Sequence, residues 1–169
     1  MSLYFQATLT RVRSPVGHTP IIRTHPQRDH VHFYGALEVR TGREIALPAK
    51  EQTSLTTANF LRILLLLFPN HLLLLLDHAP WHSGSELDAL FAENEDRLHV
   101  MRYPVACPEL NPQEHVWSQT REHISHNHQY IHFQTLIDDF EAYLNETPFE
   151  CNFMEKYAPS ILHNYANSI

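Results

Sequence analysis

The sequence predicts an α/β protein with a mixed sheet, in which an antiparallel hairpin precedes helix-linked strands and helices cover both sides. Three observations support this class. Residues 30–39 alternate in polarity and end at a Thr-Gly turn, residues 72–76 are all leucine, and helical patterns separate that run from the next short strand. A chain of 169 residues is the size of one ordinary domain and can bury a core.

The N-terminal third reads as extended structure. The stretch "LYFQATLTRV" is rich in β-formers, and "SPVGHTP" is a Pro/Gly turn region. Strands at about residues 30–39 and 43–47 flank the turn in "RTGRE", which predicts a hairpin.

A helix is expected over residues 54–68, with Ser54, Thr56 and Thr57 as candidate caps and Pro69 after its end. The leucine run at 72–76 follows, and an unbroken apolar run predicts a strand buried on both faces. The helix and the run are interrupted by Arg62 and by the Pro-Asn-His turn, so residues 60–76 are not a membrane span, which needs about 20 apolar residues.

The second half alternates helices and a strand. "SGSELDALFAENED" predicts a helix that starts near Ser83 or Ser85, and "RLHVMRYP" predicts a short strand. "LNPQEHVWSQTREHI" predicts a helix with Pro112 in its first turn, where a missing N–H costs nothing. "YIHFQTLIDDFEAYLNE" predicts a last helix with its apolar positions at Ile131, Leu136, Ile137, Phe140 and Leu144.

Composition narrows the class of protein. The net charge of −7 argues against a free-standing nucleic-acid binder, but not against an enzyme that neutralises phosphates with metal ions. The two cysteines, Cys107 and Cys151, cannot form a disulfide scaffold and fit a reducing compartment. With no visible secretory signal, the sequence predicts a cytoplasmic protein.

Two carboxylates stand out by their context. Asp77 follows the leucine strand, at the strand end where α/β sheets place their ligands, and Glu114 lies in the first turn of a helix that follows the next strand. Neighbouring strands would bring both to one edge of the sheet, on the order of 4 to 8 Å apart, as an oxygen site for Mg²⁺ or Mn²⁺. Alternatively, Glu114 only stabilises a helix start and Asp77 is a turn carboxylate.

The stretches "LLLLLDHAPWHSG" and "YPVACPELNPQEHVW" closely resemble the catalytic core of DDE transposases of the mariner-like bacterial insertion-sequence type. "SPVGHTP" and "YGALEVRTGRE" also look like landmarks of that family. The resemblance implies a ribonuclease-H-like core over residues 1–147, with a C-terminal tail at 148–169. It implies DNA at transposon ends and a second copy of the chain as partners of the full-length protein.

The resemblance further implies a two-metal phosphoryl transfer with Mg²⁺ or Mn²⁺, in which Asp77 is the second carboxylate of the triad and Glu114 the third. His82 would contact DNA or orient a carboxylate. Asn111, a supporting or DNA-contacting residue, and Trp117 match motif positions and are expected to fix the turn and pack the helix.

The chain departs from the family pattern at the first catalytic Asp, which ends the first strand in a sequence such as Phe-x-Asp-Glu. Here "LYFQ" runs into "ATLTR", and the first acid is Asp29. Either the segment is lost or the sequence begins beyond it. His78 replaces the usual Asn after Asp77, "VAC" replaces a small polar residue before Pro108, and no helix-turn-helix is recognisable. With one ligand missing, weak metal binding is expected.

The remaining polar residues are expected to have structural rather than catalytic roles. The histidines lack zinc-finger or HExxH spacing and are expected at the surface (His25, His30, His32, His123, His126, His128, His132). Asp138 and Asp139 are expected on a solvated helix face, and Glu38 on the solvent side of a strand, although it is the nearest acid that could replace the missing Asp. Two functions are weighed: a DNA-cutting and strand-joining transposase domain, truncated or degenerate, and a non-catalytic remnant that serves as a protein-interaction or dimerisation module.

Overall fold

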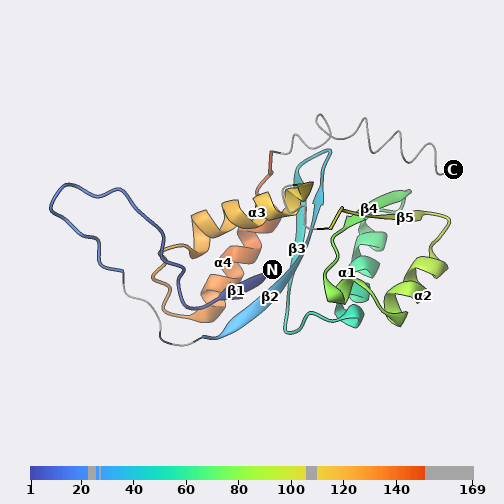
Figure 1. Cartoon of the computed structure of the whole chain (residues 1–169), viewed down its shortest axis with the longest axis horizontal. Coiled ribbons are helices and arrows are strands. Elements are labelled where there is room, and N and C mark those ends of the chain that lie inside the picture. Colours follow the sequence, from blue (N-terminus) through green and yellow to red (C-terminus); the bar gives the residue numbers. More distant parts are fainter. Residues whose placement is uncertain (23–25, 27, 106–109, 151–169) are drawn as a thin grey trace. The chain divides into compact units, whose positions relative to one another are not determined.

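The computed structural model describes residues 1–22, 26, 28–105 and 110–150, so Cys107, Cys151, His25 and most of the predicted tail lie outside the described residues (Figure 1). The predicted order of strand, hairpin, helix, strand, helix, strand, helix, helix is confirmed. The chain divides into two compact units. The first contains residues 1–3, 30–34 and 47–111, and the second contains the described residues of 4–29 and 35–46 and those from 112 onward.

A three-stranded antiparallel sheet has the order β1-β2-β3, with β1 at Ser2–Tyr4, β2 at His30–Glu38 and β3 at Arg43–Ala49. Met1 and Phe33 exchange both backbone hydrogen bonds, at 2.8 and 2.9 Å, which is the antiparallel pattern. The predicted hairpin is confirmed by the neighbouring strands β2 and β3, whose turn is closed by the Thr41 and Gly42 N–H groups donating to the Glu38 carbonyl at 3.2 and 2.9 Å. The extended stretch at residues 3–12 was predicted too broadly. Among its described residues after β1 ends at Tyr4, only Thr8 makes a β-bridge, and its partner is His126.

A parallel strand pair forms from β4 (Leu72–Leu76) and β5 (Leu98–Arg102), with Leu76 opposite Arg102. Helix α2 (Ser85–Glu93) lies between the two strands in sequence and packs against α1 (Ser54–Leu67), which precedes them (Figure 1). Parallel strands need such a crossover, so the α/β class is confirmed.

The burial predicted for β4 was wrong. Only Leu76 is buried, at 8% exposure, and Leu72 through Leu75 are half-buried. Within the described residues β4 pairs with β5 alone. A strand with one neighbour cannot be shielded as a central strand is, so the leucine run indicated a strand but overstated its depth.

The predicted cap of α1 was also wrong by one residue. Thr53 is the N-cap, and its side chain accepts from the Thr56 N–H while the Thr56 hydroxyl accepts from the Thr53 N–H, which completes a capping box. The Ser54 hydroxyl instead donates to Glu86 at 3.0 Å, and the buried Thr57 hydroxyl donates to Tyr34 at 3.1 Å.

In the second unit, α3 (Pro112–Thr120) continues into a π-helical turn at Arg121–Ser125, and α4 (Phe133–Glu146) packs against α3. Leu136, Phe140 and Leu144 of α4 are fully buried, as the pattern predicts, and Asp138 and Asp139 are exposed. Ile131 is 76% exposed because the helix begins two residues after it.

The prediction of surface histidines fails at His128. This residue is 8% exposed, and its ring stacks on Phe5 with centroids 6.4 Å apart, since an imidazole can pack as an aromatic ring. Glu38 is half-buried rather than fully on the solvent side, and its carboxylate accepts from the Thr41 hydroxyl at 2.7 Å.

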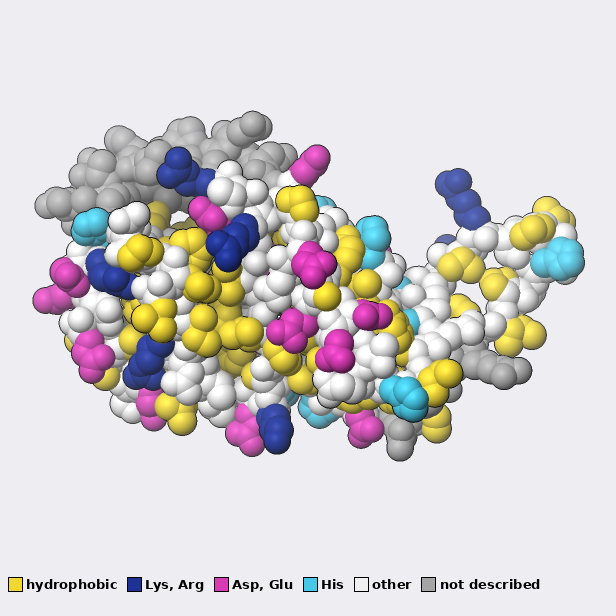
Figure 2. Space-filling model, turned by 180° about the vertical axis from the view of Figure 1, so that it is seen from behind, with side chains coloured by type: hydrophobic (Ala, Val, Ile, Leu, Met, Phe, Trp, Pro, Cys, Tyr) yellow, Lys and Arg dark blue, Asp and Glu magenta, His cyan; other side chains and the backbone are white. Residues whose placement is uncertain are grey.

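The surface mixes side-chain types. Figure 2 shows acidic side chains spread among hydrophobic ones, with hydrophobic and basic side chains on the loop at its right edge. This loop lies between Thr8 and Ile22 and exposes Leu9, Val12, Val16 and Ile21. Among the described residues, no helix has the length and apolar character that crossing a membrane requires.

Candidate active site

Asp77 directly follows β4, and its carboxylate is held in a tight turn. Its Oδ1 accepts from the Ala79 N–H at 2.9 Å, the bond that a short acidic side chain makes two residues ahead. Pro80–His82 then form a single 3₁₀ turn, in which the His82 N–H donates to the Ala79 carbonyl at 2.9 Å. This turn returns the chain so that His82 faces Asp77.

The imidazole of His82 is the nearest side-chain partner of Asp77. Its Nδ1 lies 2.6 Å from Oδ1 of Asp77, and the side chains are 16% and 47% exposed respectively. The contact becomes an ion pair when the imidazole is protonated. The structure thus places His82 beside Asp77, and its role stays a prediction.

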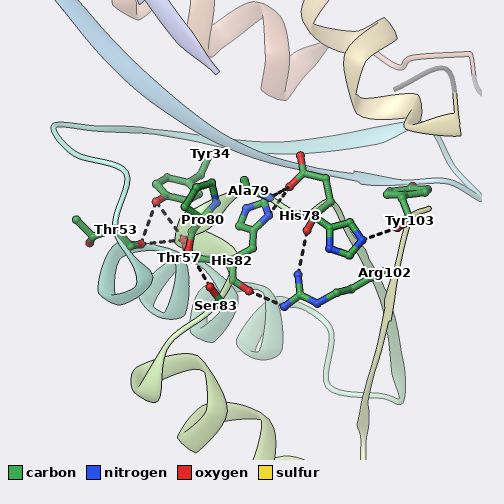
Figure 3. A network of polar contacts seen from close by, with 11 residues as sticks. Tyr34, Thr53, Thr57, His78, Ala79, Pro80, His82, Ser83, Arg102 and Tyr103 are labelled. Carbon is green, nitrogen blue, oxygen red and sulfur yellow. Dashed lines mark hydrogen bonds and ion pairs between the residues drawn. The ribbon is translucent and has the colours of Figure 1, made fainter. Parts of the chain in front are cut away.

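Residues at the end of strand β5 also hold this turn in place (Figure 3). The Arg102 guanidinium donates to the Asp77 carbonyl at 3.0 Å and to the His82 carbonyl at 2.7 Å. Nε2 of His78 lies 2.8 Å from the Tyr103 carbonyl. Two backbone points and one side chain thus tie the turn to the end of β5, next to the Leu76–Arg102 pair.

The electrostatics of this turn keep Asp77 ionised. The His82 imidazole holds the pKa of Asp77 below its usual range, burial acts in the opposite direction, and the Ala79 N–H adds to the lowering. A half-exposed carboxylate that is charged at neutral pH is suited to bind a cation.

Glu114 lies in the first turn of α3 and is exposed. Pro112 begins this helix, as predicted, while Val116 and Trp117 on its other side are buried. Trp117 therefore packs the helix as expected. Asn111 precedes Pro112 and is half-buried.

Asp77 and His82 are brought together, but Asp77 belongs to the first compact unit and Glu114 to the second. The expected separation of the two carboxylates therefore stays a prediction. Among the described residues, no group of three His, Cys, Asp or Glu side chains is arranged to hold a metal ion.

The donor chemistry of the two predicted ligands fits a hard divalent cation. Both are carboxylates, Glu114 is exposed, and the contacts of Asp77 with His82 and Ala79 both fall on Oδ1. Mg²⁺ and Mn²⁺ bind through a few carboxylates together with water and substrate phosphates, so both residues could contribute one ligand oxygen each.

Sequence reasoning missed two residues. Arg102 could have been found, because a basic residue ends the strand expected to lie beside the leucine strand. Glu44 of β3 could not. It is 1% exposed, and its Oε1 accepts from Nε2 of Gln113 at 2.7 Å. Strand alternation alone does not show which residues of "REIALPA" face the core.

With this geometry established, comparison with known proteins defines the class. Residues 5–137 match a family described as DDE superfamily endonuclease. This match covers well over half of the chain, and the chain belongs to that family.

Solved structures of similar fold include three of the Mos1 transposase. They include a paired-end complex with left transposon end (14% identity, TM-score 0.66, covering 89% of this chain and 47% of that one). The Mos1 strand transfer complex matches with 14% identity, a TM-score of 0.68 and coverage of 92% and 49%. The Mos1 mariner paired end complex with Mn matches with 15% identity, a TM-score of 0.68 and coverage of 92% and 50%.

These likenesses establish a ribonuclease-H-like fold. The chain spans about half the length of the Mos1 chains that it matches. No curated protein sequence matches it.

Proposed function

We propose that residues 1–147 are the catalytic core of a transposase, built for metal-dependent cutting and joining of DNA and impaired by the loss of its first carboxylate. The observation that carries this proposal is the ionised Asp77 at the end of β4. Its carboxylate contacts the His82 imidazole and accepts from the Ala79 N–H, and its backbone carbonyl accepts from Arg102. Membership of the DDE superfamily endonucleases supports the reaction class.

In this proposal Asp77 and Glu114 are two ligands of the metal site. A bound pair of Mg²⁺ or Mn²⁺ ions would activate water or a 3′ hydroxyl and stabilise the leaving oxygen. The chain's own contribution is positional: His82 orients the Asp77 carboxylate, and Arg102 holds the backbone carbonyls of Asp77 and His82. Metal sites depend on such outer partners for ligand orientation.

In this proposal the first carboxylate is absent from the stretch that directly follows β1. β1 is present and ends at Tyr4, and the residues after it are Phe5, Gln6 and Ala7. The family pattern Phe-x-Asp-Glu, which this stretch resembles from Phe5 onward, would have its Asp at Ala7.

The test restores that carboxylate. Ala7→Asp should allow Mn²⁺-dependent nicking of supercoiled plasmid DNA, while the unmodified chain should show no appreciable nicking. Adding Asp77→Ala or Glu114→Ala should remove the gained activity by at least roughly 100-fold, since even outer-shell partners of metals are worth about 10- to 100-fold.

Gln6→Asp is the matched control, because it adds the same charge one residue earlier, at an exposed position, whereas Ala7 is 6% exposed. Circular dichroism should first show that Ala7→Asp still folds. Cleavage by the unmodified chain that survives both Asp77→Ala and Glu114→Ala would overturn the proposal.

A second candidate function, a dimerisation module without catalysis, is supported by the outer face of α1. Three leucines there are exposed: Leu55 at 53%, Leu66 at 82% and Leu67 at 46%. Sedimentation that shows a dimer, lost on Leu66→Glu, together with an inactive Ala7→Asp variant, would favour this candidate.

A further inference from the structure

Glu44 is a buried acid that the proposed reaction does not use. It lies on β3 at 1% exposure, and its Oε2 is buried and has no hydrogen-bond partner within the described part of the chain. Its Oε1 accepts from the side-chain amide of Gln113, in the first turn of α3. An apolar side chain would fill a buried site at lower cost than a carboxyl group with a single partner. The polar link to α3 is therefore the distinctive feature of this site.

The site is shaped around the carboxyl group by a glycine. A Cβ at Gly35 of β2 would collide with Oε1 of Glu44 and with the ring of Trp117. Trp117 follows Gln113 by four residues, so both side chains leave α3 on one face. Helix α3 thus packs against the hairpin through two side chains. The Gln113 amide bonds Glu44, and the Trp117 indole fills the space beside the Glu44 carboxyl group.

We propose that Glu44 is a positioning residue, which through Gln113 fixes the first turn of α3 and thereby the backbone of the next residue, Glu114. The proposal rests on the proposed function only for the role of Glu114. The hold of Glu44 on α3 can be tested without DNA or metal.

Burial raises the pKa of Glu44 to about 8, against a smaller lowering by the Gln113 amide. Charged and titratable side chains occur on every element around it. They are Glu38 on β2, Arg43 beside it on β3, Glu114 and His115 on α3, and Glu141 on α4, whose Asn145 bonds Ala46 of β3. Arg43, Glu114 and His115 are exposed, and the pKa of Glu44 is set by burial and by the Gln113 amide rather than by a neighbouring charge.

The stability of the first turn of α3 should therefore depend on pH. At neutral pH the carboxyl group is protonated and its burial is tolerated. Above about pH 8 it ionises with one hydrogen bond to stabilise the charge, which is costly in a buried site. A Glu44 carboxyl group that is exposed when the first turn of α3 opens has its ordinary pKa of 4.5, so opening should become more frequent as pH rises from about 4.5 to about 8.

Hydrogen exchange on the full chain tests this. At pH 9, amides of residues 115–117, whose intrahelical bonds close the first turn, should exchange at least about tenfold faster in the unmodified chain than in Glu44→Gln, which keeps an acceptor for Gln113 but cannot ionise. At pH 4.5, where ionisation of the carboxyl group does not yet favour opening, the two proteins should agree within about twofold. Amides of α4 serve as an internal reference and should differ less, because a merely global loss of stability would affect both helices alike.

Glu38→Gln, on the same hairpin, is the matched control and should behave as the unmodified chain at both pH values. Should Glu44→Gln fail to fold, ¹³C NMR titration of the unmodified chain decides: a Glu44 carboxyl that titrates below pH 6 overturns the proposal. Equal exchange of the unmodified chain and Glu44→Gln at pH 9 also overturns it. A failed DNA-nicking test would leave these outcomes unchanged and would count only against the proposed function.

Discussion

Asp77 and Glu44 are the same chemical group in opposite environments. Asp77 is half-exposed and has an imidazole and an N–H directed at one oxygen, which lowers its pKa. Glu44 is buried, which raises its pKa to about 8, and the neutral Gln113 amide is its single donor among the described residues. Burial disfavours the charged form in both residues, and the number and charge of the donors decide which effect prevails.

The two environments suit different uses of a carboxyl group. Asp77 is charged and accessible at neutral pH, as a cation ligand must be. Glu44 is neutral at that pH and tied to Gln113, so it serves packing and position. Residue type therefore does not distinguish the two roles, whereas local donors and exposure do.

The largest expected effect concerns stability against pH. The folded-state pKa of Glu44 lies above its ordinary value of 4.5, so its protonated form is favoured by folding. The free energy of unfolding should therefore fall as pH rises from about 4.5 to about 8, by about 1.4 kcal/mol for each pH unit between these two values. Urea unfolding from pH 5 to 9 should show this slope in the unmodified chain and a flatter profile in Glu44→Gln. An unchanged slope in the variant would assign the pH dependence to another group.

A smaller loss of stability is expected when a side chain is added at Gly35, because it would crowd Glu44. Gly35→Ala should destabilise the chain by roughly 1–3 kcal/mol, because the added methyl group displaces Glu44 or Trp117. Gly17→Ala is the control for the loss of a glycine: a Cβ there meets no atom within 4 Å, and its φ of 86° costs about 1 kcal/mol. Chemical denaturation compares the two. Equal losses would mean that Glu44 and Trp117 are loosely packed.

The smallest effect is expected at Asp77. His82→Gln should raise the Asp77 pKa toward its ordinary value, because the imidazole is the largest cause of the lowering. The stabilising contribution of Asp77 is present above that ordinary value and is lost as pH falls through the folded-state pKa. The variant should therefore lose it at a higher pH than the unmodified chain. ¹³C NMR titration of the carboxyl groups measures the change in pKa, and Glu44, in the other compact unit, should keep its value. An unchanged Asp77 titration would show that the His82 imidazole does not lower the pKa of Asp77.

Much of the fold could be predicted because its signals are local. The Thr-Gly turn between alternating segments, the leucine run and Pro112 at a helix start each act within a few residues. Thr53 was missed as the cap because neighbouring hydroxyl residues compete for that role and only backbone geometry selects one. The depth of β4 was overstated because it depends on which strands pair with it.

The candidate site was predictable in part. Asp77, His82 and Glu114 came from motif positions, and the structure brings the first two together. The contact of Glu44 with Gln113 joins residues 69 positions apart, and no local pattern encodes it. The Glu44 carboxyl group fits because Gly35 has no side chain, and this space forms only when β2, β3 and α3 pack together.

That empty space at Gly35 also constrains how the chain can vary in evolution. Positions 35, 44 and 117 share one volume, so a larger residue at 35 needs a smaller side chain at 44 or a smaller ring at 117. Among relatives of this chain, we expect these three positions to covary. A glycine at 35 should accompany the buried acid, and its loss should coincide with a shorter or apolar residue in place of Glu44.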